Sequence, residues 1–77
     1  MNANVTKEGV EVKVGQLWRD LDYRQNGRLV QVLAVEKGRA TIANYSHSTG
    51  LEKSTTKLSV QRMHKSSTGW QLVQESA

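Results

Sequence analysis

The chain has 77 residues and a formal net charge of +4, and it contains no cysteine, proline or phenylalanine. A chain of this length has room for one small domain, and the absence of cysteine excludes disulfides and thiolate metal sites. Apolar residues make up 36% of the sequence, and no apolar stretch approaches the roughly 18 residues of a membrane-spanning helix. The first residues also lack the apolar region of a signal peptide, so we expect a cytoplasmic protein without membrane association.

The amino-terminal part divides into a polar segment and a strand. Residues 1–9 are polar, and we expect them to form a flexible tail. From Val10 onward apolar residues alternate with charged ones, so Val10, Val12 and Val14 would share one face of a half-buried strand. The folded domain, a single small β-barrel, is therefore predicted to span 10–75.

The rest of the chain alternates between short strand-like segments and turns. Branched and alternating apolar residues predict the strands, and stretches rich in Gly, Ser and Asn predict the turns. The two tryptophans, Trp18 and Trp70, are expected in the core because each buries a large area. We expect extended chain over 16–21, strands over 28–35, 39–46, 54–60 and 70–74, turns at 22–27 (closed by Asn26-Gly27), 36–38 and 47–53, and one helical turn at 61–63.

Five short strands without a convincing helix indicate an all-β fold. So few strands hide enough apolar surface only if the sheet curls on itself. The long first connection, the tight second hairpin and the helical turn before the last strand favour an SH3-like order. We therefore predict a five-stranded SH3-like small barrel with a short 3₁₀ turn before its last strand.

Several short motifs along the chain together form one sequence pattern. It reads G-Q-x-W-R-D-x-D-x-R followed by G-R, and its parts are Gly15-Gln16-Leu17-Trp18-Arg19-Asp20-Leu21-Asp22, Arg24, Gly27-Arg28, Thr56, Leu58, Val60, Arg62 and Gly69-Trp70-Gln71-Leu72-Val73. Over about residues 12–74 this layout resembles that of small, largely uncharacterised bacterial and phage proteins, and more widely that of SH3-like barrels of the KOW and Tudor kind. The resemblance implies a module that binds nucleic acids or protein segments through its loops and one barrel face.

Basic residues concentrate in the second half of the chain. Residues 1–38 carry six basic and five acidic groups, whereas residues 39–77 carry five basic and two acidic ones. Serines and threonines lie between these cations, and both groups contact phosphate in nucleic-acid complexes. We predict contact with DNA or RNA through Lys53, Lys57, Arg62 and Lys65, with Arg39 extending the patch and Tyr45 as a stacking surface. The alternative is a solvated basic face that keeps the protein soluble.

A second charged cluster surrounds the first turn, and it has two interpretations. Its members are Arg19, Asp20, Asp22, Tyr23, Arg24 and Arg28. Guanidinium groups steered by carboxylates would bind an anionic group, or the cluster would be a salt-bridge network that pins the first hairpin. The cluster also supports an alternative function, a protein-interaction module. Such a phage or mobile-element factor would bind or inhibit a host protein, or self-associate. The protein itself would be a monomer or a small homo-oligomer.

Catalytic and metal-binding patterns are weak. The only histidines, His47 and His64, lie on separate predicted loops without the carboxylate spacing of a zinc site. The sequence contains no Gly-rich phosphate loop and no nucleophile motif. We therefore expect a protein that is not an enzyme and that uses no metal or other cofactor.

Overall fold

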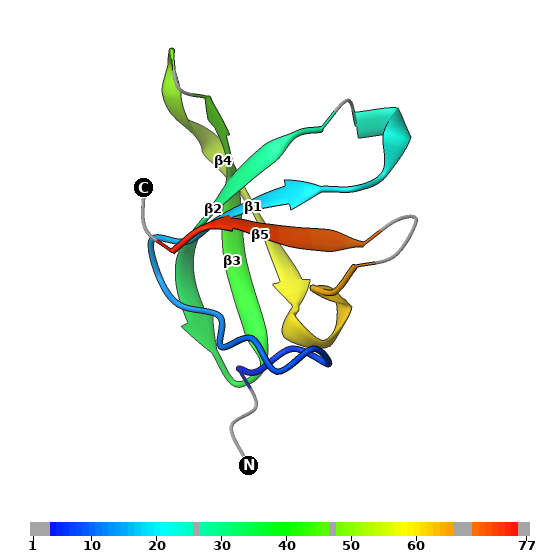
Figure 1. The fold of residues 1–77 in the computed structure, drawn as a ribbon. Coiled ribbons are helices and arrows are strands. Elements are labelled where there is room, and N and C mark those ends of the chain that lie inside the picture. The colour runs from blue at the N-terminus through cyan, green and yellow to red at the C-terminus, as the bar shows by residue number, and fades with distance from the viewer. Residues whose placement is uncertain (1–3, 26, 47, 66–68, 76–77) are drawn as a thin grey trace.

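The structure is a computed structural model that describes residues 4–25, 27–46, 48–65 and 69–75. Five antiparallel strands form one sheet with the order β4-β3-β2-β1-β5 (Figure 1). The strands are β1 (Leu17–Asp20), β2 (Leu29–Glu36), β3 (Arg39–Ser46), β4 (Gly50–Ser59) and β5 (Trp70–Gln74). Two 3₁₀ turns, η1 (Tyr23–Gln25) and η2 (Val60–Arg62), precede β2 and β5. The predicted all-β class and the helical turn before the last strand are confirmed.

The hairpin of β2 and β3 is the centre of the sheet. Its register runs from Leu29 opposite Tyr45 to Glu36 opposite Arg39. The connecting residues Lys37 and Gly38 both have positive φ, 50° and 79°. This conformation matches the right-handed twist of the flanking strands, which is why such two-residue turns are favoured in hairpins. The tight hairpin predicted at 36–38 is confirmed.

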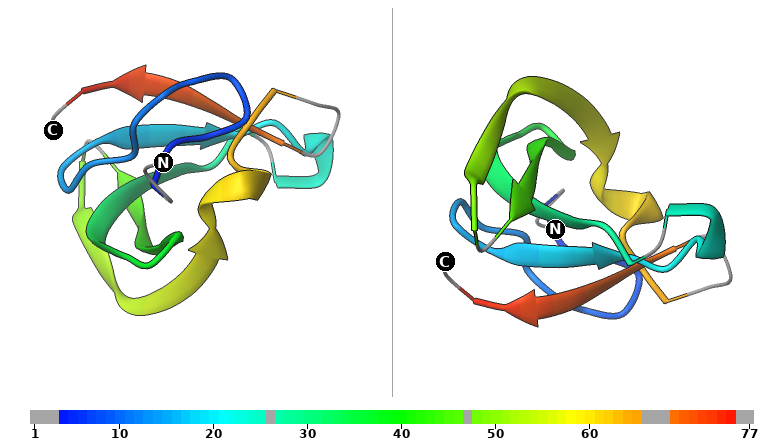
Figure 2. Two further views of the ribbon diagram at one scale, coloured as in Figure 1. Left: turned by 90° about the horizontal axis from the view of Figure 1, so that it is seen from below. Right: turned by 90° about the horizontal axis from the view of Figure 1, so that it is seen from above.

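The sheet curls strongly without closing. Strand β4 arches over the concave side of the sheet and leads into η2, as the two views in Figure 2 show. In the described part of the chain, β4 and β5 are the two edges of the sheet and do not pair with each other. The barrel prediction is therefore confirmed only as a curled, five-stranded antiparallel sheet, and its concave side stays open between these edges.

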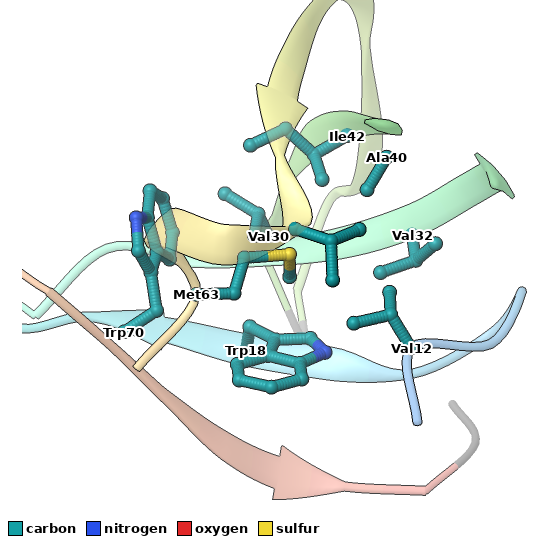
Figure 3. Close-up of a cluster of buried hydrophobic side chains, with 9 residues drawn as sticks. Val12, Trp18, Val30, Val32, Ala40, Ile42, Met63 and Trp70 are labelled. Atoms are coloured by element: carbon teal, nitrogen blue, oxygen red, sulfur yellow. The ribbon is translucent and has the colours of Figure 1, made fainter. Parts of the chain in front are cut away.

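The core fills the concave side of the sheet at one end. Side chains from β1, β2, β3 and the η2 segment converge there (Figure 3). Trp18 is 1% exposed and Trp70 is 7% exposed, which confirms that both tryptophans are buried. Met63 follows η2 and is fully buried, so the 3₁₀ turn closes the core from the side opposite the sheet. The core cluster consists of Val12, Trp18, Val30, Val32, Ala40, Ile42, Val60, Met63 and Trp70.

The strand predicted from Val10 to Val14 is wrong. The first strand begins at Leu17; Val12 is buried, whereas Val14 is 63% exposed. The cause is a loop centred on Gln16, whose buried amide donates to the carbonyl of Glu11 at 2.9 Å. Side-chain bonds of this kind compete with a regular ladder and hold the chain in a turn.

The segment expected to be a tail lies against the sheet from Asn4 onward. The carbonyl of Asn4 accepts a hydrogen bond from the Val12 amide at 2.8 Å, and its side-chain oxygen accepts one from Gly38 at 2.9 Å. Thr6 is buried. The predicted tail residues 1–3 lie outside the described part of the chain.

The turn between β3 and β4 is shorter than predicted. Strand β4 begins at Gly50 rather than at residue 54, because Leu51 pairs with Tyr45 beyond an irregularity in the register. Two residues of the predicted turns, Asn26 and His47, lie outside the described part of the chain, as do residues 66–68.

Candidate functional site

The open concave side of the sheet forms a cleft of about 330 Å³ beside the core, here called the concave cleft. Along β3 the inward positions change from Ala40 and Ile42, which are buried, to Asn44. Along β4 they change from Leu58, which packs against the core, to exposed Thr56, Ser54 and Glu52. The apolar core therefore ends part-way along the strands, and the cleft continues it with polar walls. Its lining includes Arg28, Asn44, Glu52, Thr56, Arg62 and Trp70.

Four side chains form a hydrogen-bonded row across the sheet, here called the polar relay: Asp20, Arg28, Asn44 and Glu52. Arg28 donates from Nη2 to Asp20 Oδ2 at 2.7 Å and from Nη1 to Asn44 Oδ1 at 3.4 Å. Asn44 Nδ2 donates to Glu52 Oε2 at 3.1 Å. The relay thus connects β1, the residue before β2, β3 and β4, and three of its members line the concave cleft.

Arg28 is the fixed centre of this relay. Its guanidinium carbon lies 5.6 Å from the centroid of the Trp70 ring, within the range of a cation–π contact. Asp20 is 6% exposed and also accepts a hydrogen bond from the Asp22 amide. The Nε of Arg28 is buried and has no hydrogen-bond partner among the described residues. An ion pair, an amide and an aromatic ring therefore define one orientation of the guanidinium.

A second ion pair lies at η1. Arg24 donates from Nε and Nη2 to the two carboxylate oxygens of Asp22, at 3.1 and 2.8 Å. These side-chain hydrogen bonds lower the pKa of Asp22 and raise the pKa of Arg24. Of the two interpretations of the charged cluster around the first turn, its geometry is that of a salt-bridge network, because Arg24 and Arg28 each hold an aspartate.

The two remaining members of the cluster carry no ion pair in the described part of the chain. Arg19 is exposed and alternates with buried Trp18 and Asp20, so its side chain points to the convex face. Tyr23 is 84% exposed at η1. The cluster predicted as one surface is thus divided between two faces of the sheet.

A row of unpaired cations, here called the cationic belt, follows the edge strand β4 and the adjoining turns. Its members are Lys37, Arg39, Lys57 and Arg62. The three ion pairs among the described residues involve Lys13, Arg24 and Arg28, and none involves the belt. No belt cation among the described residues lies within ion-pair distance of a carboxylate, although Glu36 is directly opposite Arg39 in the sheet.

The belt connects the concave cleft with a second cleft on the convex face, here called the outer cleft, of about 370 Å³. Arg62 lines the first, Lys37 and Arg39 line the second, and Lys57 lines both because it lies on the edge strand. Glu36 is the carboxylate of the outer cleft. An anionic chain lying over the edge would meet one cation after another.

Only part of the predicted nucleic-acid surface is brought together. Arg39, Lys57 and Arg62 belong to the belt, and Lys53 is exposed on β4 but lines neither the concave nor the outer cleft. Lys65 lies elsewhere, since its amide donates to Glu8 Oε1 at 3.1 Å.

Tyr45 is half-buried on β3 opposite Leu29 and Leu51, and it lines neither of these clefts. Sequence reasoning missed Lys37. The signal for it was present, because a two-residue hairpin turn places Lys37 beside Arg39.

No group of three or more His, Cys, Asp or Glu side chains in the described part of the chain is placed to hold a metal ion. No helix in the described ranges is long and apolar enough to cross a membrane.

Comparison with known proteins found no family model, no curated protein and no solved structure that matches the chain. The resemblance to small bacterial and phage proteins stays a prediction. The function proposed below therefore depends on the geometry of the clefts, the polar relay and the cationic belt.

Proposed function

We propose that this protein is a small, non-enzymatic binding module with an SH3-like sheet that contacts the phosphate backbone of DNA or RNA through the cationic belt. One observation carries the proposal: Lys37, Arg39, Lys57 and Arg62 follow one edge of the sheet and have no carboxylate partner in the described structure, whereas Arg24 and Arg28 are each paired with an aspartate. Unpaired cations in a row release counterions from a nucleic acid when they bind its phosphates.

The surroundings of the belt support the same function. Ser54, Thr55 and Thr56 are exposed on β4 between Lys53 and Lys57, and hydroxyl groups are common donors to phosphate oxygens. The strand order and the 3₁₀ turn before β5 support the SH3-like assignment, although the edges of the sheet stay apart. The predicted surface is thereby revised: Lys37 joins it, and Lys53, Lys65 and Tyr45 lie outside the belt.

The test is fluorescence anisotropy of labelled DNA and RNA at low and at moderate salt, with Lys57→Glu, Arg62→Glu and Arg19→Glu variants. We expect binding that weakens steeply with salt, with a slope about one unit shallower for each lost phosphate contact. Lys57→Glu and Arg62→Glu are expected to weaken binding at least tenfold. Arg19→Glu makes the same change of charge on the convex face of β1 and controls for net charge.

Where binding is observed, two results would still overturn the proposal. One is binding that ignores ionic strength, because phosphate contacts always release counterions. The other is an equal loss in all three variants, because that would indicate an effect of net charge rather than of the belt.

The alternative function, a protein-interaction module, is favoured by the exposure of Tyr23. Its side chain stands 84% exposed between the paired Asp22 and Arg24, and tyrosine is enriched in protein interfaces. Arg19, on the convex face of β1, is the other exposed member of the predicted surface without an ion pair. Absence of nucleic-acid binding at low salt would leave this alternative as the better explanation.

A further inference from the structure

We propose that the concave cleft holds one unpaired nucleobase, so that the protein prefers single-stranded to double-stranded nucleic acid. This inference rests on the proposed function, because the belt would hold the phosphates on either side of that base.

The chemistry of the cleft matches the surfaces of a base. Ile42 and Leu58 provide an aliphatic floor, and Trp70 lies at one side. The walls carry hydrogen-bonding groups, the hydroxyls of Ser54 and Thr56 and the amide of Asn44. A nucleobase has apolar faces and a polar edge, so it would contact both kinds of surface at once. The volume, about 330 Å³, lies at the lower end of small-molecule sites, which occupy roughly 300–1,000 Å³.

The polar relay prepares the cleft for such a ligand. Asp20 and Trp70 hold Arg28, and Arg28 and Glu52 hold the two ends of the Asn44 amide. Asn44 uses one N–H and one lone pair in these contacts, which leaves one donor and one acceptor site for a base edge. Groups that are already ordered lose little entropy when a ligand binds.

The position of the cleft beside the belt explains why the ligand would be part of a strand. Lys57 and Arg62 line the cleft themselves, so a base inside it would have its flanking phosphates near both cations. A base within a duplex is stacked and paired, and it would first have to break both contacts and leave the helix. An unpaired base enters without that step, and the cleft therefore selects single strands.

The experiment fills the cleft without changing any charge. Thr56 faces the cleft opposite Ile42, and the adjacent Thr55 faces the other side of β4 opposite Ala43. Both are exposed, and aromatic residues are well tolerated in strands, so Thr56→Phe and Thr55→Phe form a matched pair. Anisotropy is measured with short labelled single strands and with the matching duplexes, at two salt concentrations.

We expect the unchanged protein to bind single strands at least about fivefold more tightly than duplexes, the lower end of the effect of one stacked base. Thr56→Phe is expected to remove this preference and to keep the salt dependence, whereas Thr55→Phe keeps both. If circular dichroism shows that Thr56→Phe is unfolded, Ser54→Phe replaces it, because Ser54 lines the same cleft.

The outcomes separate the two proposals. Equal, salt-sensitive binding of single strands and duplexes would overturn the base-binding cleft and leave the belt intact. A preference that survives in Thr56→Phe, or that is lost in Thr55→Phe as well, would also overturn it. Absence of binding to every nucleic acid would overturn the proposed function itself.

Discussion

The β1–β2 connection and the cationic belt use the same kinds of side chain in opposite ways. Around the connection, Arg24 and Arg28 each contact an aspartate at 2.7–2.8 Å. Along the belt, Lys57 and Arg62 have no carboxylate partner among the described residues. The difference shows that the density of basic residues in a sequence is a poor guide to the charge that a surface offers. What matters is which cations the fold leaves without a partner.

The two regions should therefore differ in what each substitution affects. A cation that is held by a carboxylate contributes to stability, and its removal leaves a partner without compensation. A solvated, unpaired cation contributes almost nothing to folding. We expect changes in the connection to lower the free energy of unfolding, and changes in the belt to lower affinity for an anion.

The largest effect on stability is expected for Asp20→Ala. The substitution removes the buried partner of Arg28 and one end of the polar relay, and we expect a loss of about 2–3 kcal/mol in the free energy of unfolding. Urea denaturation followed by tryptophan fluorescence measures it. Asp20→Asn, which keeps a hydrogen-bond acceptor, isolates the contribution of the charge. A loss below about 0.5 kcal/mol for Asp20→Ala would mean that the relay contributes nothing to the fold.

A smaller effect, dependent on pH, is expected for Asp22→Asn. Hydrogen bonds from Arg24 lower the pKa of the Asp22 carboxyl in the folded protein, so this group stabilises the fold above its unfolded pKa of about 3.9. That contribution disappears as the pH falls through the lower folded-state pKa. The unchanged protein should thus exceed Asp22→Asn in stability at neutral pH and lose this advantage as the pH falls below the unfolded-state pKa of about 3.9. A difference that stays constant over this range would contradict the assignment.

The smallest effect on stability is expected in the belt. Lys57→Glu and Arg62→Glu break no ion pair in the described structure, so the free energy of unfolding should change by less than about 0.5 kcal/mol. The same urea denaturation measures it, on the proteins used for the binding experiment. A large loss of stability in either variant would show that these cations support the fold, and the contrast between the two regions would fail.

Local patterns in the sequence determined most of the strands and turns. Alternating and branched residues predicted the strands now seen as β2 and β3, and Glu36-Lys37-Gly38 predicted the turn between them. The helical turn before β5 and the burial of both tryptophans were also predicted. These features depend on neighbours along the chain, through side-chain alternation and backbone φ, so a single sequence contains enough information for them.

Only the tertiary structure decided where the first strand begins and which cations share one surface. The alternation of Val10, Val12 and Val14 is that of a strand, yet the hydrogen bonds of Gln16 hold this segment as a loop. Lys65 was grouped with Lys57 by its sequence position, but its backbone is tied to Glu8 instead. The concave cleft exists because the sheet curls without closing, and its walls come mainly from β3 and β4 through their register, with Arg28, Arg62 and Trp70 beside them. Curvature and register arise from contacts between distant residues, and no local pattern of side chains contains them.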